Sequence, residues 1–409
     1  MDIRPELHRS PPDTSPLPPS APVLVERLRA EIAADGPITF ARFMAVALAD
    51  PEHGYYATAD DRPTRTGDFL TAPELHPIFG AVLARALHEQ WQALDRPARF
   101  VLREYGAGTG TLAESLLRGL ADARSGLLDA IAYAPTELLP ARVERIRERL
   151  TRAGFGAAVG GAAAAVGDER PTADGEGPAA DGAVLANEFL DALPVHRVAR
   201  RAGHLVERFV DIAAAGWGFE EIEAEPSTPA LADRLAAEGV DLADGQVAEI
   251  RLATDDWVAG MSAGLERGFA TILDYGRPAA ELYGPSRRDG TLRAYSGQRA
   301  HADPFVAIGR QDLTAHVDFT AVERAASALG WRSLGLTTQA EFLVGSGFGD
   351  LFAAHQAVPD VEPEAYLALR AAAARLLDPR ALGGFRVLVL GRGVPADTAL
   401  RGLTYRVRG

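Results

Sequence analysis

Cysteine and lysine are both absent from this chain of 409 residues, so all 42 of its basic side chains are arginines. Without cysteine the protein has no disulfide, thiolate nucleophile, zinc–thiolate site or iron–sulfur cluster. Without lysine it has no Walker A loop, no Schiff-base lysine and no lysine general base. No apolar run approaches the ~18 residues that a membrane-spanning helix needs, so no membrane span is predicted.

Positive charge is also scarce, and the formal net charge is -14. Nucleic-acid binding is dominated by basic contacts to phosphate, so this excess of acid argues against a nucleic-acid partner and favours a neutral or basic one. The hydrophobic content of 47% and the charged content of 24% are ordinary for a soluble globular protein. The composition therefore predicts a folded protein with a full core.

Residues 1–22 form an arm rich in proline and serine. The arm mixes acids with prolines and has no apolar core, so it fits neither a secretory signal nor an acid-poor transit peptide. We therefore expect a disordered arm on a cytoplasmic protein. The sequence gives no indication of the oligomeric state.

Beyond the arm, the pattern predicts four segments of a doubly wound, Rossmann-like α/β fold. Residues 23–98 are predicted to be helices around a long loop at 53–74, which is typical of a lid or a binding loop. Strand, turn and helix patterns at 99–195 indicate the first part of a cofactor-binding core. We expect an inserted antiparallel meander with helices at 196–266 and the remaining core strands at 267–409.

Six short apolar segments are predicted to be the buried strands of the core sheet. Apolar runs separated by helical patterns are typical of parallel strands that are covered on both faces. The segments are 99–105, 130–137, 183–189, 269–275, 331–339 and 385–391. By contrast, the stretch 154–182 is rich in alanine, glycine and aspartate, and we expect it to be a solvated excursion.

The sharpest local motif is a glycine cluster between a predicted strand and a helix, EYGAGTGTL. Glycines at such a turn let the backbone approach a ligand, and the following helix offers unpaired N–H groups. Gly106, Gly108 and Gly110 have the spacing G-x-G-x-G, not the dinucleotide spacing G-x-G-x-x-G. The carboxylate of Glu104 would repel a pyrophosphate and attract the cationic S-adenosylmethionine. The motif therefore favours a methyl donor, and NAD binding and a purely structural turn are the alternatives.

Acidic side chains end the next two predicted strands. Glu137 ends the second strand, where nucleotide-binding folds place an acid that accepts hydrogen bonds from the ribose; the alternative is a surface glutamate. The sole asparagine, Asn187, and Glu188 end the third strand, and Asp191 follows shortly after. Two carboxylates suit a guanidinium, whose planar donors pair with them. The alternative is helix capping by Asn187 and acids that complement a helix dipole.

Two further segments carry candidate site residues. Asp68 and Thr71, in GDFLTAPE, are predicted either to cover the cofactor as part of a lid or to form a turn and a helix start. The loop QDLTAHVDF places His316 and Asp318 just before a predicted helix, for which Asp318 is a suitable cap. Substrate contact is the functional role that we expect for this loop. A metal site needs more ligands at closer spacing, so none is predicted.

Taken together, these motifs resemble the MidA-like S-adenosylmethionine-dependent methyltransferases. The mitochondrial members of that family are protein arginine methyltransferases, which act on a subunit of respiratory complex I during its assembly. The resemblance extends from Gly36 to Arg392, with the motifs in the order of the family. The segments that carry it are GPITFARFMAVALADPEHGYY, GDFLTAPELHPIFG, EYGAGTGTL, ANEFLDALPVHR, and GTLRAYSGQRAHADPF followed by QDLTAHVDFTA.

The resemblance implies a class I-like methyltransferase with S-adenosylmethionine as its cofactor. It implies that Glu104 and the three glycines line the methyl-donor site and that Glu137 holds the ribose. The family usually has a serine close to the acid of the second strand, where this chain has Leu138 and Leu139. The ribose assignment is therefore carried by fewer matching residues than the glycine turn.

On the side of the acceptor, the resemblance implies an arginine of a protein substrate. Asn187, Glu188 and Asp191 would border the reacting end of the cofactor. The two acids would orient the guanidinium, and His316 or Asp318 would accept its proton through water. Two other functions remain open from the sequence: a non-catalytic assembly factor that binds the methyl donor, and an NAD-linked oxidoreductase.

Overall fold

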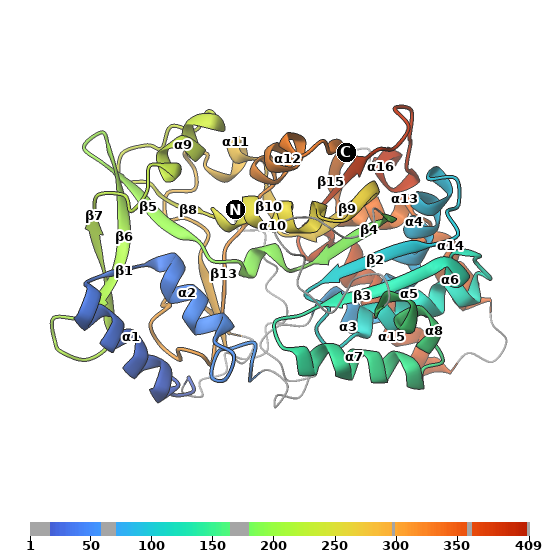
Figure 1. Ribbon diagram of the computed structural model, residues 1–409, viewed down its shortest axis with the longest axis horizontal. Coiled ribbons are helices and arrows are strands. Elements are labelled where there is room, and N and C mark those ends of the chain that lie inside the picture. The colour runs from blue at the N-terminus through green and yellow to red at the C-terminus, as the bar shows by residue number, and fades with distance from the viewer. Residues whose placement is uncertain (1–16, 59–70, 164–179, 297–298, 358–361, 407–409) are drawn as a thin grey trace.

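A six-stranded sheet forms the core of one lobe of the computed structural model, on the right in Figure 1. The structure describes residues 17–58, 71–163, 180–296, 299–357 and 362–406. The strands lie in the order β15-β16-β9-β4-β2-β3. They are β2 (Phe100–Tyr105), β3 (Ile131–Thr136), β4 (Ala180–Asn187), β9 (Leu265–Asp274), β15 (Arg332–Thr338) and β16 (Arg386–Arg392). Each of them overlaps one of the predicted core strands.

Strand direction confirms the doubly wound α/β fold. Strands β3, β2, β4 and β9 run parallel to one another, whereas β16 is antiparallel to both β9 and β15. Parallel neighbours need crossover connections, which helices supply between β2 and β3 and between β3 and β4. The carboxyl ends of the parallel strands therefore meet at one edge of the sheet, where folds of this class bind ligands.

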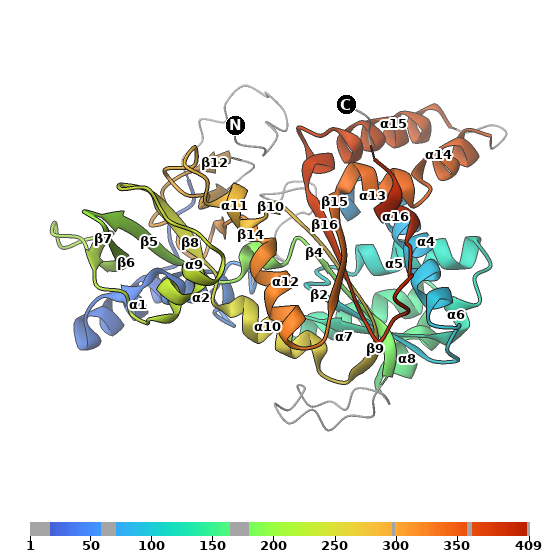
Figure 2. The same ribbon diagram turned by 90° about the horizontal axis from the view of Figure 1, so that it is seen from above.

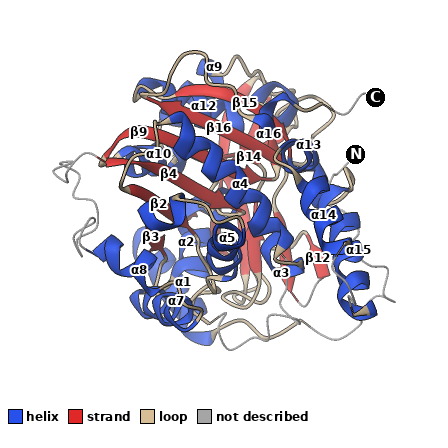
Figure 3. Ribbon diagram, turned by 90° about the vertical axis from the view of Figure 1, so that its right-hand side faces the viewer, coloured by secondary structure: helices blue, strands red, loops and turns tan. Residues whose placement is uncertain are grey.

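Helices cover both faces of the sheet (Figure 3). Phe269 and Leu273 of β9 pack into the core under α4 (Ile78–Ala93) and α5 (Thr111–Asp122). The alternate residues Ala270 and Ile272 pack under α10 (Ala253–Ser262) and α12 (Phe319–Ala328). The other helical elements are α1 (Pro22–Asp35), α2 (Phe40–Ala49), α3 (Ala72–Leu75), α6 (Leu127–Ala130), α7 (Pro140–Arg152), α8 (Gly156–Ala163), η3 (Leu190–Ala192), α9 (Ala230–Ala237), α11 (Ala279–Leu282), α13 (Gln339–Gly345), α14 (Phe348–Gln356), α15 (Pro363–Leu377), η4 (Leu382–Gly384) and α16 (Arg401–Thr404).

A second sheet forms the lobe that also contains α1 and α2 (Figures 1 and 2). Its strands pair antiparallel in the order β1-β6-β5-β8, and β7 pairs with β6. They are β1 (Ile38–Thr39), β5 (His196–Arg201), β6 (His204–Ile212), β7 (Phe219–Ala224) and β8 (Val247–Ile250). Leu24, Leu28 and Ile32 of α1 are buried in this lobe because their spacing of four places them on one helix face.

Short strands connect the two lobes. One small sheet has the order β12 (Arg299–His301), β11 (Arg293–Ser296) and β13 (Asp312–Thr314). A parallel pair, β10 (Gly276–Arg277) with β14 (Val317–Asp318), joins the segment after β9 to the start of α12. No helix among the described residues is both long and apolar enough to cross a bilayer.

In the stretch 154–182, which we expected to be solvated, the described residues 156–163 differ from that expectation. Helix α8 packs against β3 and α7, and Ala158 and Val159 are buried there. Small side chains let a helix approach its neighbours closely, so a run of alanine and glycine also makes a packed helix. Residues 164–179 lie outside the described residues, as do residues 1–16 of the predicted arm.

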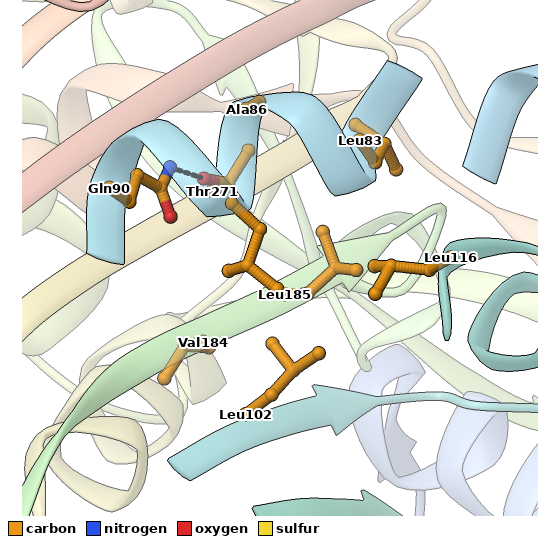
Figure 4. A pocket seen from close by; sticks show the side chains of 9 residues that line it. Leu83, Ala86, Gln90, Leu102, Leu116, Val184, Leu185 and Thr271 are labelled. Atoms are coloured by element: carbon orange, nitrogen blue, oxygen red, sulfur yellow. Dashed lines mark hydrogen bonds between the residues drawn. The ribbon is translucent and has the colours of Figure 1, made fainter. Parts of the chain in front are cut away.

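A small apolar cavity lies in the core between α4, α5 and the sheet (Figure 4). Its volume of about 20 Å³ is enough for one water molecule. Leucines from both helices and from β2 and β4 line most of it, and Gln90 Nε2 donates a hydrogen bond of 2.9 Å to Thr271 Oγ1 at its edge. The cavity is too small for a cofactor and is not at the carboxyl edge, so the functional site lies elsewhere.

Replacing Thr271 by valine tests how much this buried hydrogen bond stabilises the core. The variant T271V leaves the amide of Gln90 without its acceptor, and we expect the free energy of unfolding to fall by about 1–3 kcal/mol. The double variant T271V/Q90M should recover part of that loss, because both polar groups are then absent. Urea unfolding of the three proteins measures the difference. Equal stability of T271V and the wild type would contradict a stabilising role of this hydrogen bond.

Candidate functional site

The glycine turn joins β2 to α5 at the carboxyl edge of the sheet. Gly106, Gly108 and Gly110 have φ angles of 67°, 58° and 78°, in a left-handed region that other residues rarely adopt. The N–H of Gly106 donates a hydrogen bond of 3.0 Å to the carbonyl oxygen of Thr136, at the end of β3. The backbone therefore fixes the turn between two parallel strands.

The space around the three glycines shows where a ligand fits. A Cβ at Gly106 would lie 2.8 Å from the ring of Phe189, and a Cβ at Gly110 would lie 3.1 Å from Ile146. A Cβ at Gly108 would meet only one backbone oxygen, at 3.9 Å. The turn is therefore packed at its first and last glycines and open at the middle one, beside the start of α5. This arrangement fits a bound small molecule.

Glu104, the acid before the turn, is only 3% exposed. The hydroxyl of Tyr133 donates a hydrogen bond of 2.7 Å to its Oε2. Burial raises the pKa of Glu104 to about 7; the bond from Tyr133 opposes the rise and the charge of Glu137 adds to it. A cation bound nearby would favour the ionised form of this carboxyl.

Glu137 follows β3 directly and contacts the glycine turn. Its Oε1 accepts a hydrogen bond of 2.5 Å from the N–H of Gly108, and its Oε2 accepts one of 3.2 Å from Arg142 Nη1. The side chain is 6% exposed, so the alternative of a surface glutamate is wrong. The carboxylate of Glu137 therefore lies beside the one glycine that leaves space for a ligand.

Asn187 and Glu188 lie at the end of β4, next to β2 in the sheet. Glu188 has a φ of 49°, a strained value for a residue with a side chain. Its Oε1 accepts hydrogen bonds of 3.3 Å from Asn187 Nδ2 and from the backbone N–H of Ala72. Asn187 Oδ1 is buried and has no hydrogen-bond partner among the described residues. A buried unpaired acceptor beside a strained acid is typical of a ligand site.

Asp191 lies in η3 and is buried. The hydroxyl of Tyr275 donates a hydrogen bond to its Oδ2. The N–H of Ala315 donates one of 3.1 Å to its carbonyl oxygen. Glu188 and Asp191 thus share one loop, but these bonds connect Glu188 to α3 and Asp191 to the segment after β9.

His316 and Asp318 have different surroundings. The buried ring of His316 packs edge-on against the ring of Tyr275 at a centroid distance of 5.4 Å, and Tyr275 bonds Asp191. Asp318 Oδ1 caps α12 by accepting hydrogen bonds of 2.9 and 3.2 Å from two backbone N–H groups. Burial, with the hydrogen bond and charge of Asp318, raises the pKa of Glu238 to about 8. His316 is therefore tied to Asp191, and Asp318 to a helix start and a second acid.

Of the two predicted lid residues, Asp68 lies outside the described residues. Thr71 precedes α3, and its N–H donates a hydrogen bond of 3.3 Å to the carboxylate of Glu74 in a capping box. The next residue, Ala72, donates to Glu188. The start of α3 therefore lies beside the end of β4.

Asp274 was not predicted as a site residue. It ends β9, and its Oδ2 accepts hydrogen bonds of 2.9 Å from the N–H of Leu190 and of 3.2 Å from that of Asp191. Burial raises the pKa of Asp274 to about 7; the charge of Arg251 opposes the rise and that of Glu188 adds to it. The rule that located Glu188, an acid at the end of a parallel strand, applies equally to Asp274.

Residues 82–337 match the model of a family of S-adenosyl-L-methionine-dependent methyltransferases. The chain belongs to this family. It is a methyltransferase with S-adenosylmethionine as its methyl donor, so the predicted cofactor and the MidA-like resemblance are confirmed and the NAD-linked alternative is wrong.

Named relatives of this methyltransferase cover most of its length. It is 30% identical to the Drosophila melanogaster mitochondrial protein arginine methyltransferase NDUFAF7 homolog, over 75% of this chain and 70% of the relative. It is 29% identical to human mitochondrial NDUFAF7, also named a protein arginine methyltransferase, over 80% of this chain and 74% of the relative. These mitochondrial relatives contradict the cytoplasmic location that we expected from the sequence.

A solved structure shares the whole architecture of the methyltransferase. It is a Burkholderia thailandensis protein bound to S-adenosyl-homocysteine. The sequences are 36% identical, the TM-score is 0.78, and the match covers 95% of this chain and 97% of that one. The doubly wound fold is therefore that of a methyltransferase.

Replacing Gly108 by valine tests the open side of the turn. We expect G108V to lose binding of S-adenosyl-homocysteine, because a branched side chain would occupy the only open position of the turn. The matched control is G203A, at a turn glycine with a φ of 83° and no atom within 4 Å of an added Cβ. Calorimetry and circular dichroism compare binding with folding. Normal binding by a folded G108V would place the cofactor elsewhere.

Ligand binding should depend on pH through Glu104. Its carboxyl has a pKa raised to about 7, so it is mostly protonated below that pH. S-adenosyl-homocysteine carries a cationic amino group, which favours the ionised form, so its affinity should rise as pH increases through 7 and binding should release a proton. Calorimetry in buffers of different ionisation enthalpy measures the release. E104Q should remove it, and an unchanged release in E104Q would assign the proton to another group.

Proposed function

We propose that this methyltransferase methylates arginine side chains of a protein substrate. The relatives from fly and human are named protein arginine methyltransferases. The acids at the carboxyl edge support the same acceptor, since a guanidinium cation pairs with carboxylates. The observation that carries the proposal is the carboxylate of Glu188, which is fixed at a strained turn next to the strand that leads into the glycine turn.

The cofactor side of the proposal uses the residues around the glycine turn. Close approach of the ligand at Gly108 would bring its ribose to Glu137, whose carboxylate already accepts from that glycine. Glu104 would face the cationic amino-acid end of the ligand, and Asn187 Oδ1 supplies a buried acceptor nearby. We also propose that the six-stranded sheet holds the cofactor.

On the acceptor side, catalysis is mainly a matter of position. S-adenosylmethionine supplies a methyl group that is activated by its bond to a positively charged sulfur. Glu188 accepts hydrogen bonds from the guanidinium and turns one of its nitrogens toward that methyl. The nitrogen–carbon bond forms as the sulfur–carbon bond breaks, and the proton of the nitrogen leaves through water to His316. Tyr275, whose hydroxyl bonds Asp191, packs edge-on against the ring of this histidine.

Labelled S-adenosylmethionine tests the proposal directly. The enzyme is incubated with cell lysate and the methyl-labelled donor, and the labelled proteins are digested and analysed by mass spectrometry. We expect the label on arginine side chains of protein. A sample of the enzyme alone controls for methylation of its own arginines. Label found only on another amino acid, or only on small molecules, would overturn the arginine assignment.

The variant E188Q separates acceptor binding from cofactor binding. We expect its affinity for S-adenosyl-homocysteine to stay close to that of the wild type and methyl transfer to fall by about 10²-fold or more, because the nucleophile is misplaced. D191N should lose less, since the carboxylate of Asp191 is buried against Tyr275. E223Q is a control, because Glu223 pairs with Arg201 in the second sheet. Full turnover by E188Q would refute the proposed role of Glu188.

A further inference from the structure

Arg251, a buried arginine outside the predicted site, contacts the two loops that carry the acceptor residues. It follows β8 and is 5% exposed. Its guanidinium donates hydrogen bonds only to backbone carbonyl oxygens in the described residues. These are Leu193 O at 3.1 Å, Asp191 O at 3.2 Å, Ala315 O at 2.9 Å and His316 O at 3.3 Å. The carbonyls of Leu193 and Asp191 belong to the loop after β4, and those of Ala315 and His316 belong to the loop before β14.

The partners of Arg251 are unusual for a buried cation. All four acceptors are uncharged, whereas buried charges are generally paired with a charge of opposite sign. Asp274, Asp191 and Asp318 compensate its charge from further away, and burial lowers the pKa of Arg251. An apolar side chain often stabilises a core as well as a buried charge does. The arrangement is therefore better explained by the geometry that the planar guanidinium imposes on the two loops.

Asp274 binds the same turn as Arg251, but it accepts hydrogen bonds there, whereas Arg251 donates them. Its carboxylate accepts from the N–H groups of Leu190 and Asp191, while Arg251 donates to the carbonyls of Asp191 and Leu193. The carboxylate comes from the end of β9 in the six-stranded sheet, and the guanidinium comes from the end of β8 in the second sheet (Figures 1 and 2). Two opposite charges from different lobes thus fix one short turn.

We propose that Arg251 is a positioning residue of the acceptor side, which, with Asp274 as its charge partner, fixes Asp191 relative to His316. The assignment of Asp191 and His316 to the acceptor side rests on the proposed function. The contacts of Arg251 do not rest on the proposed function, because Arg251 bonds the same backbone carbonyls whichever molecule accepts the methyl group. Loss of the guanidinium should therefore release the two loops from each other and leave the glycine turn intact.

Three variants separate the effect of Arg251 on the position of the two loops from its compensation of the charge of Asp274. R251M leaves Asp274 without its cation and should lower the melting temperature. D274N removes the carboxylate charge but keeps an acceptor oxygen. The double variant R251M/D274N buries no uncompensated charge, so it should recover most of the melting temperature lost in R251M. If Arg251 positions the loops, the double variant still shows kcat reduced by about 10²-fold and a raised KM for the protein acceptor, with unchanged affinity for S-adenosyl-homocysteine.

Hydrogen exchange gives a readout that does not depend on which molecule accepts the methyl group. In the double variant the amides of Leu190, Asp191 and Ala315 should exchange faster than in D274N, which is the matched comparison because the amides of Leu190 and Asp191 bond Asp274 itself. R197M is the control: Arg197 is also buried but pairs with Glu221 and Glu249 within the second sheet, so it should lower stability without changing these amides or kcat.

The outcomes distinguish this proposal from the proposed function. Recovery of both stability and kcat in the double variant, or unchanged exchange at the three amides, would overturn the positioning role of Arg251. Faster exchange together with label on a residue other than arginine would support that role and overturn only the arginine acceptor.

Discussion

The carboxyl edge of the six-stranded sheet gathers acids from three parallel strands: Glu104 from β2, Glu188 from the end of β4 and Asp274 from β9. Burial raises the pKa of both Glu104 and Asp274 to about 7, and the charge of Glu137 adds to the first rise and that of Glu188 to the second. The methyl donor and the proposed guanidinium acceptor are both cations, so their binding would favour the ionised form of these carboxyls. Arg251 is a cation of the chain itself at the same edge, and it donates its hydrogen bonds to backbone carbonyls. Its charge opposes the rise in the pKa of Asp274.

Features encoded by neighbouring residues could be predicted from the sequence. The core strands other than β15 contain short apolar stretches, and the glycine turn needs left-handed backbone at three closely spaced positions, which glycine itself reveals. Glu137 and Glu188 are predicted because parallel strands end at one edge, so the position of an acid at a strand end fixes its place in the fold, and Glu104 is predicted because it precedes the first glycine of the turn. Asp274 obeys the same rule, and its place at the end of a predicted strand was the signal that we did not use.

Features that depend on distant contacts could not be predicted. The bonds from Arg251 to the acceptor loops span 58 to 65 positions, and the bond from the hydroxyl of Tyr56 to Asp312 spans 256. No periodicity or spacing identifies such partners, because they lie in distant segments of the chain. The helix at 156–163 also depends on packing against β3 and α7, because its small residues allow close contact although their composition resembles that of a solvated loop. The capping role of Asp318 was anticipated because it is local.

A continuous chain of hydrogen bonds explains how the two lobes keep a fixed relation around the site. The N–H of Gly108 donates to Glu137, Arg142 donates both to Glu137 and to the carbonyl of Tyr56, and the hydroxyl of Tyr56 donates to Asp312 in β13. One end of this chain is the open glycine of the cofactor turn, and the other is the small sheet that precedes His316. Arg251 and Asp274 join the same lobes at η3. Methyl transfer requires the donor and the acceptor to be aligned, and these two sets of contacts within the protein hold the elements around the site in place before either ligand binds.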